Sequence, residues 1–165
     1  MMYICGVDPG LSGAICLMAI PGSSPLPVKI IDMPTHEITV NGKRKRQLDL
    51  YQLGQFFDEN SKYIKKAIVE SPSAMPGQGV SSVFKFGYNC GAIQGIIAAN
   101  FIPMQLVHPA TWKKDMGLTK DKDACRLKAS QEMPSEAHNW ARSKDDGRAE
   151  SFLLALYGIK KMQSV

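Results

Sequence analysis

Four carboxylates occupy positions at which acidic side chains can bind metal ions. Asp8 directly follows the apolar run 2–7, and Glu70 ends the apolar run 67–69 in the same way. Strand ends in α/β sheets are where ligand sites collect, so these two carboxylates converge if their strands are neighbours. Asp146 and Glu150 are four residues apart and share one face of a predicted helix. Carboxylate oxygens suit Mg2+, and two such ions about 4 Å apart are the centre of a metal-dependent phosphodiesterase.

Each carboxylate also has a plainer explanation when it is taken alone. Asp8 can start a turn, and Glu70 can be a surface charge that ends a strand. Asp145 or Asp146 can cap the last helix or stabilise its dipole. Asp145 is also the competing metal ligand, because it lies about 100° away from Asp146 around the helix.

The elements that position these side chains follow from hydrophobic periodicity and from turn residues. Asn41-Gly42, between polar and β-branched residues, predicts a β-hairpin turn within 37–48. The other predicted strands are 2–8, 13–20, 27–33, 67–70 and 104–108, and the predicted helices begin near 50 and span about 81–100, 122–132 and 145–157. This order predicts one α/β domain over 1–165, with three antiparallel and then parallel strands in a mixed five-stranded sheet, flanking helices and an extra β-hairpin.

Glycines on the predicted helix 81–100 indicate close packing. Gly87, Gly91 and Gly95 recur every four residues and leave one face nearly bare. Because glycine costs about 1 kcal/mol per helix position relative to alanine, we expect this face to pack onto the chain's own sheet or onto a second copy. Trp112 and Trp140 are more typical of packing anchors than of base-stacking platforms.

Composition favours a polyanionic partner. The 165 residues carry 20 Lys and Arg against 15 Asp and Glu, a net charge of +5 with a pI near 9.0. The apolar runs are too short to span a bilayer, and the first residues lack a signal peptide. Four singly spaced cysteines indicate neither a zinc site nor a disulfide framework, which favours the cytoplasm.

Three segments resemble motifs of a known family. Residues 6–13 (GVDPGLSG) resemble the opening motif of RuvC-type Holliday junction resolvases, which have a ribonuclease H-like fold. Residues 69–70 and 146–151 resemble their second acidic motif and their C-terminal acidic helix. The loop and helix start at 75–88 are most similar to the branch found in phages and prophages. The resemblance extends over nearly the whole chain.

The resemblance implies a homodimer that cuts four-way DNA junctions by paired nicks. It assigns metal-binding, catalytic roles to Asp8, Glu70, Asp146 and Glu150, with two Mg2+ ions per site and Mn2+ as a substitute. It places Lys113 and Lys122 near the scissile phosphate, with Lys122 as a catalytic residue. Bacterial members end with two aspartates three residues apart. Here Gly147 stands three residues before Glu150, so Asp146 must serve.

Basic and loop residues are the candidates for DNA contact. The run 43–46 follows the hairpin turn and is either a DNA-backbone contact or a solvated arm. The loop after Glu70 has no aromatic residue where the bacterial enzymes carry one. The expected DNA contacts are Arg44, Lys45, Arg46, Met75, Gln78, Lys113 and Lys114. No membrane and no small-molecule cofactor are expected.

Two other functions fit the same residues. One is a ribonuclease H-like nuclease that acts on forks, flaps or RNA–DNA hybrids. The other is a protein that binds junctions without cutting them.

Overall fold

A five-stranded mixed sheet forms the centre of the fold. The computed structural model describes residues 1–20, 28–74, 76–119, 121 and 123–164. The strands are β1 (Tyr3–Val7), β2 (Ala14–Ala19), β3 (Val28–Asp32), β6 (Ile64–Glu70) and β7 (Met104–Val107). Their order is β3-β2-β1-β6-β7, with antiparallel pairs from β3 to β1 and parallel pairs from β1 to β7. The predicted sheet is therefore confirmed.

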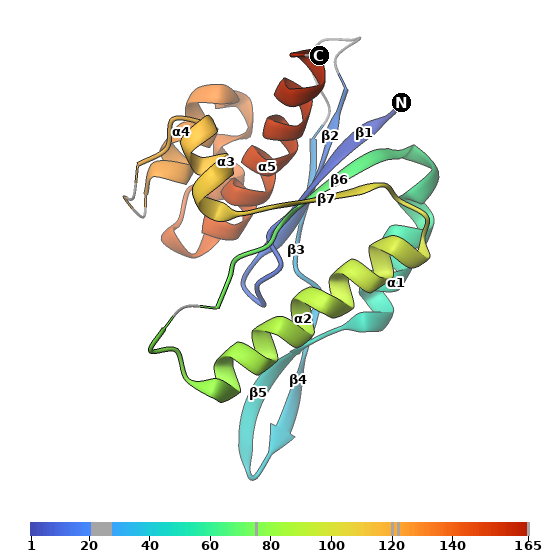
Figure 1. The fold of residues 1–165 in the computed structure, drawn as a ribbon, viewed down its shortest axis with the longest axis vertical. Helices are drawn as coiled ribbons and strands as arrows, with labels where there is room; N and C mark the ends of the chain where they lie inside the picture. Colours follow the sequence, from blue (N-terminus) through green and yellow to red (C-terminus); the bar gives the residue numbers. More distant parts are fainter. Residues whose placement is uncertain (21–27, 75, 120, 122, 165) are drawn as a thin grey trace.

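The predicted β-hairpin forms a separate two-stranded sheet. β4 (Thr35–Val40) and β5 (Lys43–Leu48) pair antiparallel and project beyond the main sheet (Figure 1). Asn41 and Gly42 have φ angles of 51° and 71°, the left-handed geometry that a tight two-residue hairpin turn requires. The guanidinium of Arg46 donates hydrogen bonds to the carbonyl of Leu11 and to Thr35 Oγ1. The first of these joins the hairpin to the loop between β1 and β2.

Helices cover both faces of the sheet (Figure 1). α1 (Leu50–Asn60) and α2 (Val80–Ala99) lie on one side, and α3 (Pro109–Asp115), α4 (Ala124–Glu132) and α5 (Asp146–Gln163) lie on the other. Short 3-10 helices span Ser61–Tyr63, Pro134–Trp140 and Ser143–Asp145. No helix in the described part of the chain is long and apolar enough to cross a membrane.

The alternation of side chains along β1 divides the core into two layers. Ile4 packs into the layer that contains Phe152 of α5, whereas Cys5 and Val7 pack into the layer that contains Leu53 of α1. Successive strand residues point to opposite faces, so a strand covered by helices on both sides is apolar throughout. This explains the buried strands on which the acidic residues end.

The structure adds one helix to the predicted set. Residues 109–115 form α3, with Pro109 in its first turn, where no helix was predicted. Proline pre-organises the first turn of a helix, and this signal was present in the sequence. Trp112 and Trp140 are both buried, as expected of packing anchors.

The glycine face of α2 does not pack against the chain's own sheet, so this part of the expectation is wrong. A Cβ atom added at Gly87, Gly91 or Gly95 meets nothing within 4 Å. The side of α2 that packs on the sheet instead carries the buried Ile93 and Ile97. Within the described residues, the glycines therefore lie on an open helix face.

Candidate active site

Asp8 lies just beyond the end of β1. Its backbone N–H donates to the carbonyl of Ala14, which closes the β1–β2 loop. Its Oδ1 accepts a hydrogen bond from Gly10 N at 3.3 Å. The strand end and the tight loop together hold the carboxylate at the edge of the sheet.

Glu70 is held beside Asp8 by the strand register. Val7 of β1 pairs with Val69 of β6, so the residues that follow them lie next to one another. Glu70 is only 8% exposed, and its Oε2 accepts a hydrogen bond from the indole Nε1 of Trp112 at 2.7 Å. Trp112 belongs to α3, which starts directly after β7, the strand that neighbours Glu70.

Glu150 reaches the same place because α5 lies unusually close to β1 and to the β1–β2 loop. A Cβ atom added at Gly6 would lie 2.0 Å from the carbonyl oxygen of Ser151, and one added at Gly147 would lie 2.5 Å from that of Ser12. Only glycine permits such an approach of two backbones. An aspartate at position 147 is therefore excluded sterically in this fold.

The three carboxylates form one cluster. Asp8, Glu70 and Glu150 each offer an oxygen, and these oxygens lie within 4.8 Å of one another. Burial, together with the negative charges of Glu150 and Glu70, raises the pKa of Asp8 to about 7. Burial and the charge of Glu150 also raise the pKa of Glu70. The fold thus holds together negative charges that repel one another.

Lys113 makes a direct ion pair with this cluster. Its Nζ donates to Glu150 Oε1 at 2.6 Å. Burial disfavours the charged form of Lys113, but the hydrogen bond and the charge of Glu150 outweigh it and raise the lysine pKa. Lys114, the next residue of α3, is exposed.

Asp146 and Asp145, the two competing ligands of the sequence prediction, both lie outside the three-carboxylate cluster. Asp146 Oδ1 lies 2.7 Å from Arg126 Nε. Asp145 is 5% exposed and accepts hydrogen bonds from the side chain and the backbone N–H of Arg142. The expectation that four carboxylates converge is thus met for three of them.

The remaining predicted residues are spread over several elements. Arg44, Lys45 and Arg46 lie on β5, where Arg44 pairs with Glu37 of β4. Gln78 is exposed in the loop before α2. Met75 and Lys122 lie outside the described residues.

Two residues at this site were missed from the sequence. Trp112 positions Glu70 through its indole N–H. This role could have been suspected from the sequence, because a buried indole N–H needs a hydrogen-bond acceptor. Arg126 pairs with Asp146 and Asp123, and no sequence pattern indicated this contact.

The donor set fits divalent metal ions. Three carboxylates offer hard oxygen ligands, which Mg2+ and Mn2+ accept. Burial and their mutual repulsion raise the pKa values of Asp8 and Glu70, and bound cations would offset the repulsion. Lys113 places a positive charge at the same cluster.

The free energy of unfolding of the metal-free protein should fall as the pH rises. The pKa of Asp8 is about 7 in the folded chain against an ordinary 3.8, so the folded state binds the extra proton. The resulting stability is lost between about pH 4 and 7 and amounts to as much as ~4 kcal/mol. Chemical unfolding in EDTA at pH 4 and pH 8 measures it. Asp8→Asn should remove most of the difference, and an unchanged pH dependence in this variant would contradict the electrostatic account.

Trp112→Phe should reduce metal affinity or activity at the site, although all three carboxylates are still present. The indole hydrogen bond lowers the pKa of Glu70, so its loss shifts the acid limb of any metal-dependent activity to higher pH. Loss of such a supporting contact reduces metal affinity or activity by about 10- to 100-fold. Trp140→Phe is the matched control, because Trp140 is equally buried but donates to Ser130 Oγ. If the control shifted the pH profile equally, the positioning role of Trp112 would be wrong.

Comparison with known proteins identifies the fold. The sequence matches no protein-family model, and no curated protein resembles it by sequence. Among solved structures, Thermus thermophilus RuvC matches with a TM-score of 0.59 and 13% identity, covering 99% of this chain and 97% of that chain. T. thermophilus RuvC in complex with its Holliday junction substrate matches with a TM-score of 0.62 and 15% identity, covering 100% of this chain and 98% of that chain. The chain therefore has the RuvC fold.

Proposed function

We propose that this RuvC-like chain is a structure-selective endonuclease that resolves four-way DNA junctions. The observation that carries the proposal is the cluster of Asp8, Glu70 and Glu150, assembled from β1, β6 and α5. Two observations support it. The similar T. thermophilus RuvC has been solved with a Holliday junction substrate, and this chain carries a net charge of +5.

Asp8, Glu70 and Glu150 hold divalent metal ions in this proposal, two Mg2+ per site with Mn2+ as a substitute. Asp146 is the fourth ligand, and its pair with Arg126 must open before it can serve. When bound, such ions activate the attacking water and stabilise the leaving oxygen of the phosphodiester.

The other residues of the site orient these groups and stabilise charge. Trp112 holds Glu70 in place through its indole N–H. Lys113 exchanges its contact with Glu150 for the scissile phosphate, where a positioned cation stabilises the charge that builds on the non-bridging oxygens. Lys122 remains a predicted catalytic residue. The products carry 5′-phosphate and 3′-hydroxyl ends.

In this proposal, DNA also contacts basic residues of two elements, β5 and α3. The basic strand β5 supplies Arg44, Lys45 and Arg46, and α3 supplies Lys114. Met75 and Gln78, in the loop before α2, are further candidates. Selectivity comes from the branched shape and from backbone contacts, which position a protein without reading sequence.

A homodimer is the assembly that suits this task. A four-way junction has two-fold symmetry and needs two nicks, yet each chain offers one carboxylate cluster. The open glycine face of α2 is the candidate contact, because it lets a second helix approach closely and nothing in the described chain covers it.

Gly91→Lys should convert the dimer into a monomer and abolish paired nicking. The position is open in the single chain, so the new side chain clashes with nothing there. Gly54→Lys is the matched control, since an added Cβ at Gly54 of α1 also meets nothing within 4 Å. Sedimentation velocity reports the assembly. A Gly91→Lys variant that stays dimeric would place the interface elsewhere.

The function is tested by cleavage of a mobile four-way junction with and without Mg2+. Nicks are mapped on all four strands, and linear duplex, fork, flap and RNA–DNA hybrid substrates compete in the same reaction. We expect metal-dependent, symmetric nicks on two strands of like polarity. A marked preference for hybrid or for forks would instead indicate the ribonuclease H-like alternative, and tight junction binding without turnover would indicate a non-cutting binder.

A further inference from the structure

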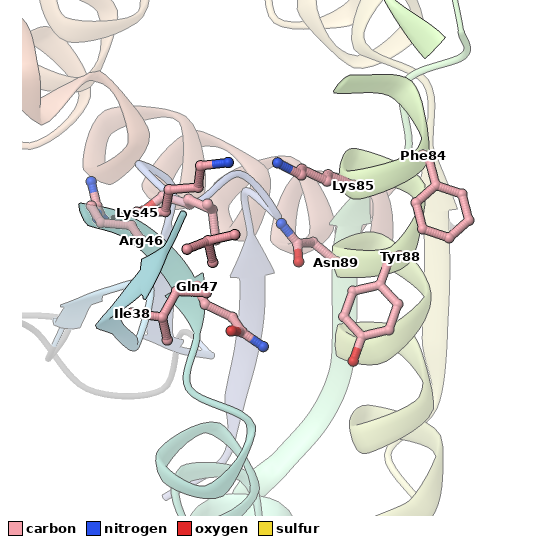
Figure 2. Close-up of a pocket in the computed structure, with 10 residues that line it drawn as sticks. Ile38, Lys45, Arg46, Gln47, Phe84, Lys85, Tyr88 and Asn89 are labelled. Carbon is pink, nitrogen blue, oxygen red and sulfur yellow. Dashed lines mark hydrogen bonds between the residues drawn. The ribbon is translucent and has the colours of Figure 1, made fainter. Parts of the chain in front are cut away.

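A groove separates the β4–β5 hairpin from the first half of α2 (Figure 2). Its volume is about 370 Å³, at the lower end of the range for ligand pockets. The lining residues come from three segments: Leu11 of the β1–β2 loop; Ile38, Val40, Lys45, Arg46 and Gln47 of the hairpin; and Phe84, Lys85, Tyr88 and Asn89 of α2. The groove therefore has room for a single nucleotide and not for a duplex.

The charge of the groove is entirely positive. Lys45 from β5 and Lys85 from α2 extend toward one another from its two sides (Figure 2). Among the described residues that line it, none is acidic, and neither lysine has a carboxylate partner within ion-pair distance in the described chain. Two such cations facing one space favour an anion between them.

The other walls of the groove are apolar and aromatic. Ile38 pairs with Lys45 in the hairpin register, so both side chains emerge on the same face of the ribbon. Across the groove, Phe84 is 74% exposed and Tyr88 is 53% exposed. Exposed rings beside cations are what single-stranded nucleic acids bind, because bases stack on the rings while the phosphates meet the cations.

The groove adjoins the loop between β1 and β2, and Asp8 of the carboxylate cluster lies at the start of that loop. Leu11, which lines it, is three residues beyond Asp8, and the guanidinium of Arg46 holds the carbonyl of Leu11. A strand whose phosphate lies at Asp8 can thus continue into the groove over the β1–β2 loop.

We propose that this groove receives an unpaired nucleotide of the DNA next to the scissile phosphate. The base lies between Tyr88 and the apolar face of the hairpin, and the adjoining phosphate lies between Lys45 and Lys85. The inference rests on the proposed nuclease function and adds to it a site that selects unpaired nucleotides at the branch point. A second copy of this chain is the rival occupant, because Phe84 borders both the groove and the open glycine face.

The first test is photochemical crosslinking. A four-way junction carries a single unpaired 5-iododeoxyuridine at the crossover, and it is irradiated with the full-length protein in EDTA, which prevents cutting. We expect the crosslink to map to Phe84 or Tyr88. A crosslink confined to segments outside the groove would overturn the proposal.

The second test measures affinity for the same junction, for a short oligodeoxythymidine and for a fully paired duplex. Tyr88→Ala should weaken binding to the first two by about 5- to 100-fold and to the duplex by less than about 2-fold. Lys85→Ala should reduce the salt dependence of oligodeoxythymidine binding by about 0.7 in log–log slope. Tyr51→Ala and Lys62→Ala are the matched controls, since Tyr51 on α1 and Lys62 beyond its end are both exposed and neither lines the groove.

These outcomes separate the groove from the nuclease function. If the wild-type protein cuts no junction but binds oligodeoxythymidine through Tyr88, the proposed function fails and the groove stands. If it cuts junctions and Tyr88→Ala binds unpaired DNA as tightly as wild type, only the groove proposal fails. Loss of the dimer in Tyr88→Ala, seen by sedimentation velocity, would assign the groove to the second copy and also overturn it.

Discussion

Asp8→Asn and Glu70→Gln are each expected to reduce junction cleavage by about 10²- to 10³-fold or more while junction binding is retained. Both substitutions remove a negative ligand from the cluster and leave its shape almost unchanged. Burial and the charges of neighbouring carboxylates raise the pKa values of Asp8 and Glu70, and a bound cation would relieve the repulsion between these groups. Metal binding should weaken in parallel with cleavage.

Single-turnover cleavage and Mn2+ titration calorimetry measure the two effects on the same preparations. Asp58→Asn is the control, because it makes the same chemical change at an exposed position on α1. Wild-type cleavage by either cluster variant would show that the carboxylates are not the reaction centre. Loss of junction binding as well as cleavage would show a structural role for the cluster.

Lys113→Met is expected to reduce cleavage by about 10²-fold, with the opposite effect on metal binding. In the structure, the ammonium group of Lys113 lies 2.6 Å from Glu150 Oε1, where it competes with a metal ion for this oxygen. Its removal frees the carboxylate, so the affinity for Mn2+ should rise. A variant that removes a metal ligand, such as Asp8→Asn, should lose both cleavage and Mn2+ affinity. This contrast distinguishes a lysine that stabilises the phosphate from a residue that binds the metal.

Lys114→Met is the matched control for Lys113→Met. The neighbouring lysine is exposed and makes no ion pair in the described chain, so we expect weaker DNA binding with a salt slope reduced by about 0.9 and normal cleavage of bound DNA. If Lys113→Met bound Mn2+ less tightly than wild type, the competition between Lys113 and metal would be disproved.

Much of the cluster could be predicted from local signals. Asp8 and Glu70 each follow a buried apolar run, and parallel neighbours bring such strand ends to one edge of a sheet. The Asn41-Gly42 turn was equally readable, because two residues with positive φ are required there and few residue types accept that geometry.

The partners of individual side chains could not be predicted. The sequence left open whether Asp145 or Asp146 is a metal ligand, and the structure shows that Arg142 pairs with Asp145 and Arg126 with Asp146. That the glycine face of α2 is open could not be predicted either. The spacing of the glycines shows that this face lacks side chains, but it does not show what packs against the face.

The sequence by itself determined most of the helices and strands and the positions of Asp8, Glu70 and Glu150 at strand ends and on a helix face, because these features are set by periodicities of a few residues. Only the tertiary structure decided how closely α5 lies on β1 at Gly6 and Gly147, that Trp112 donates to Glu70, and that Lys45 and Lys85 face one groove. These contacts join residues far apart in the chain. Their geometry depends on how whole layers pack, and no local pattern encodes a distance across two layers.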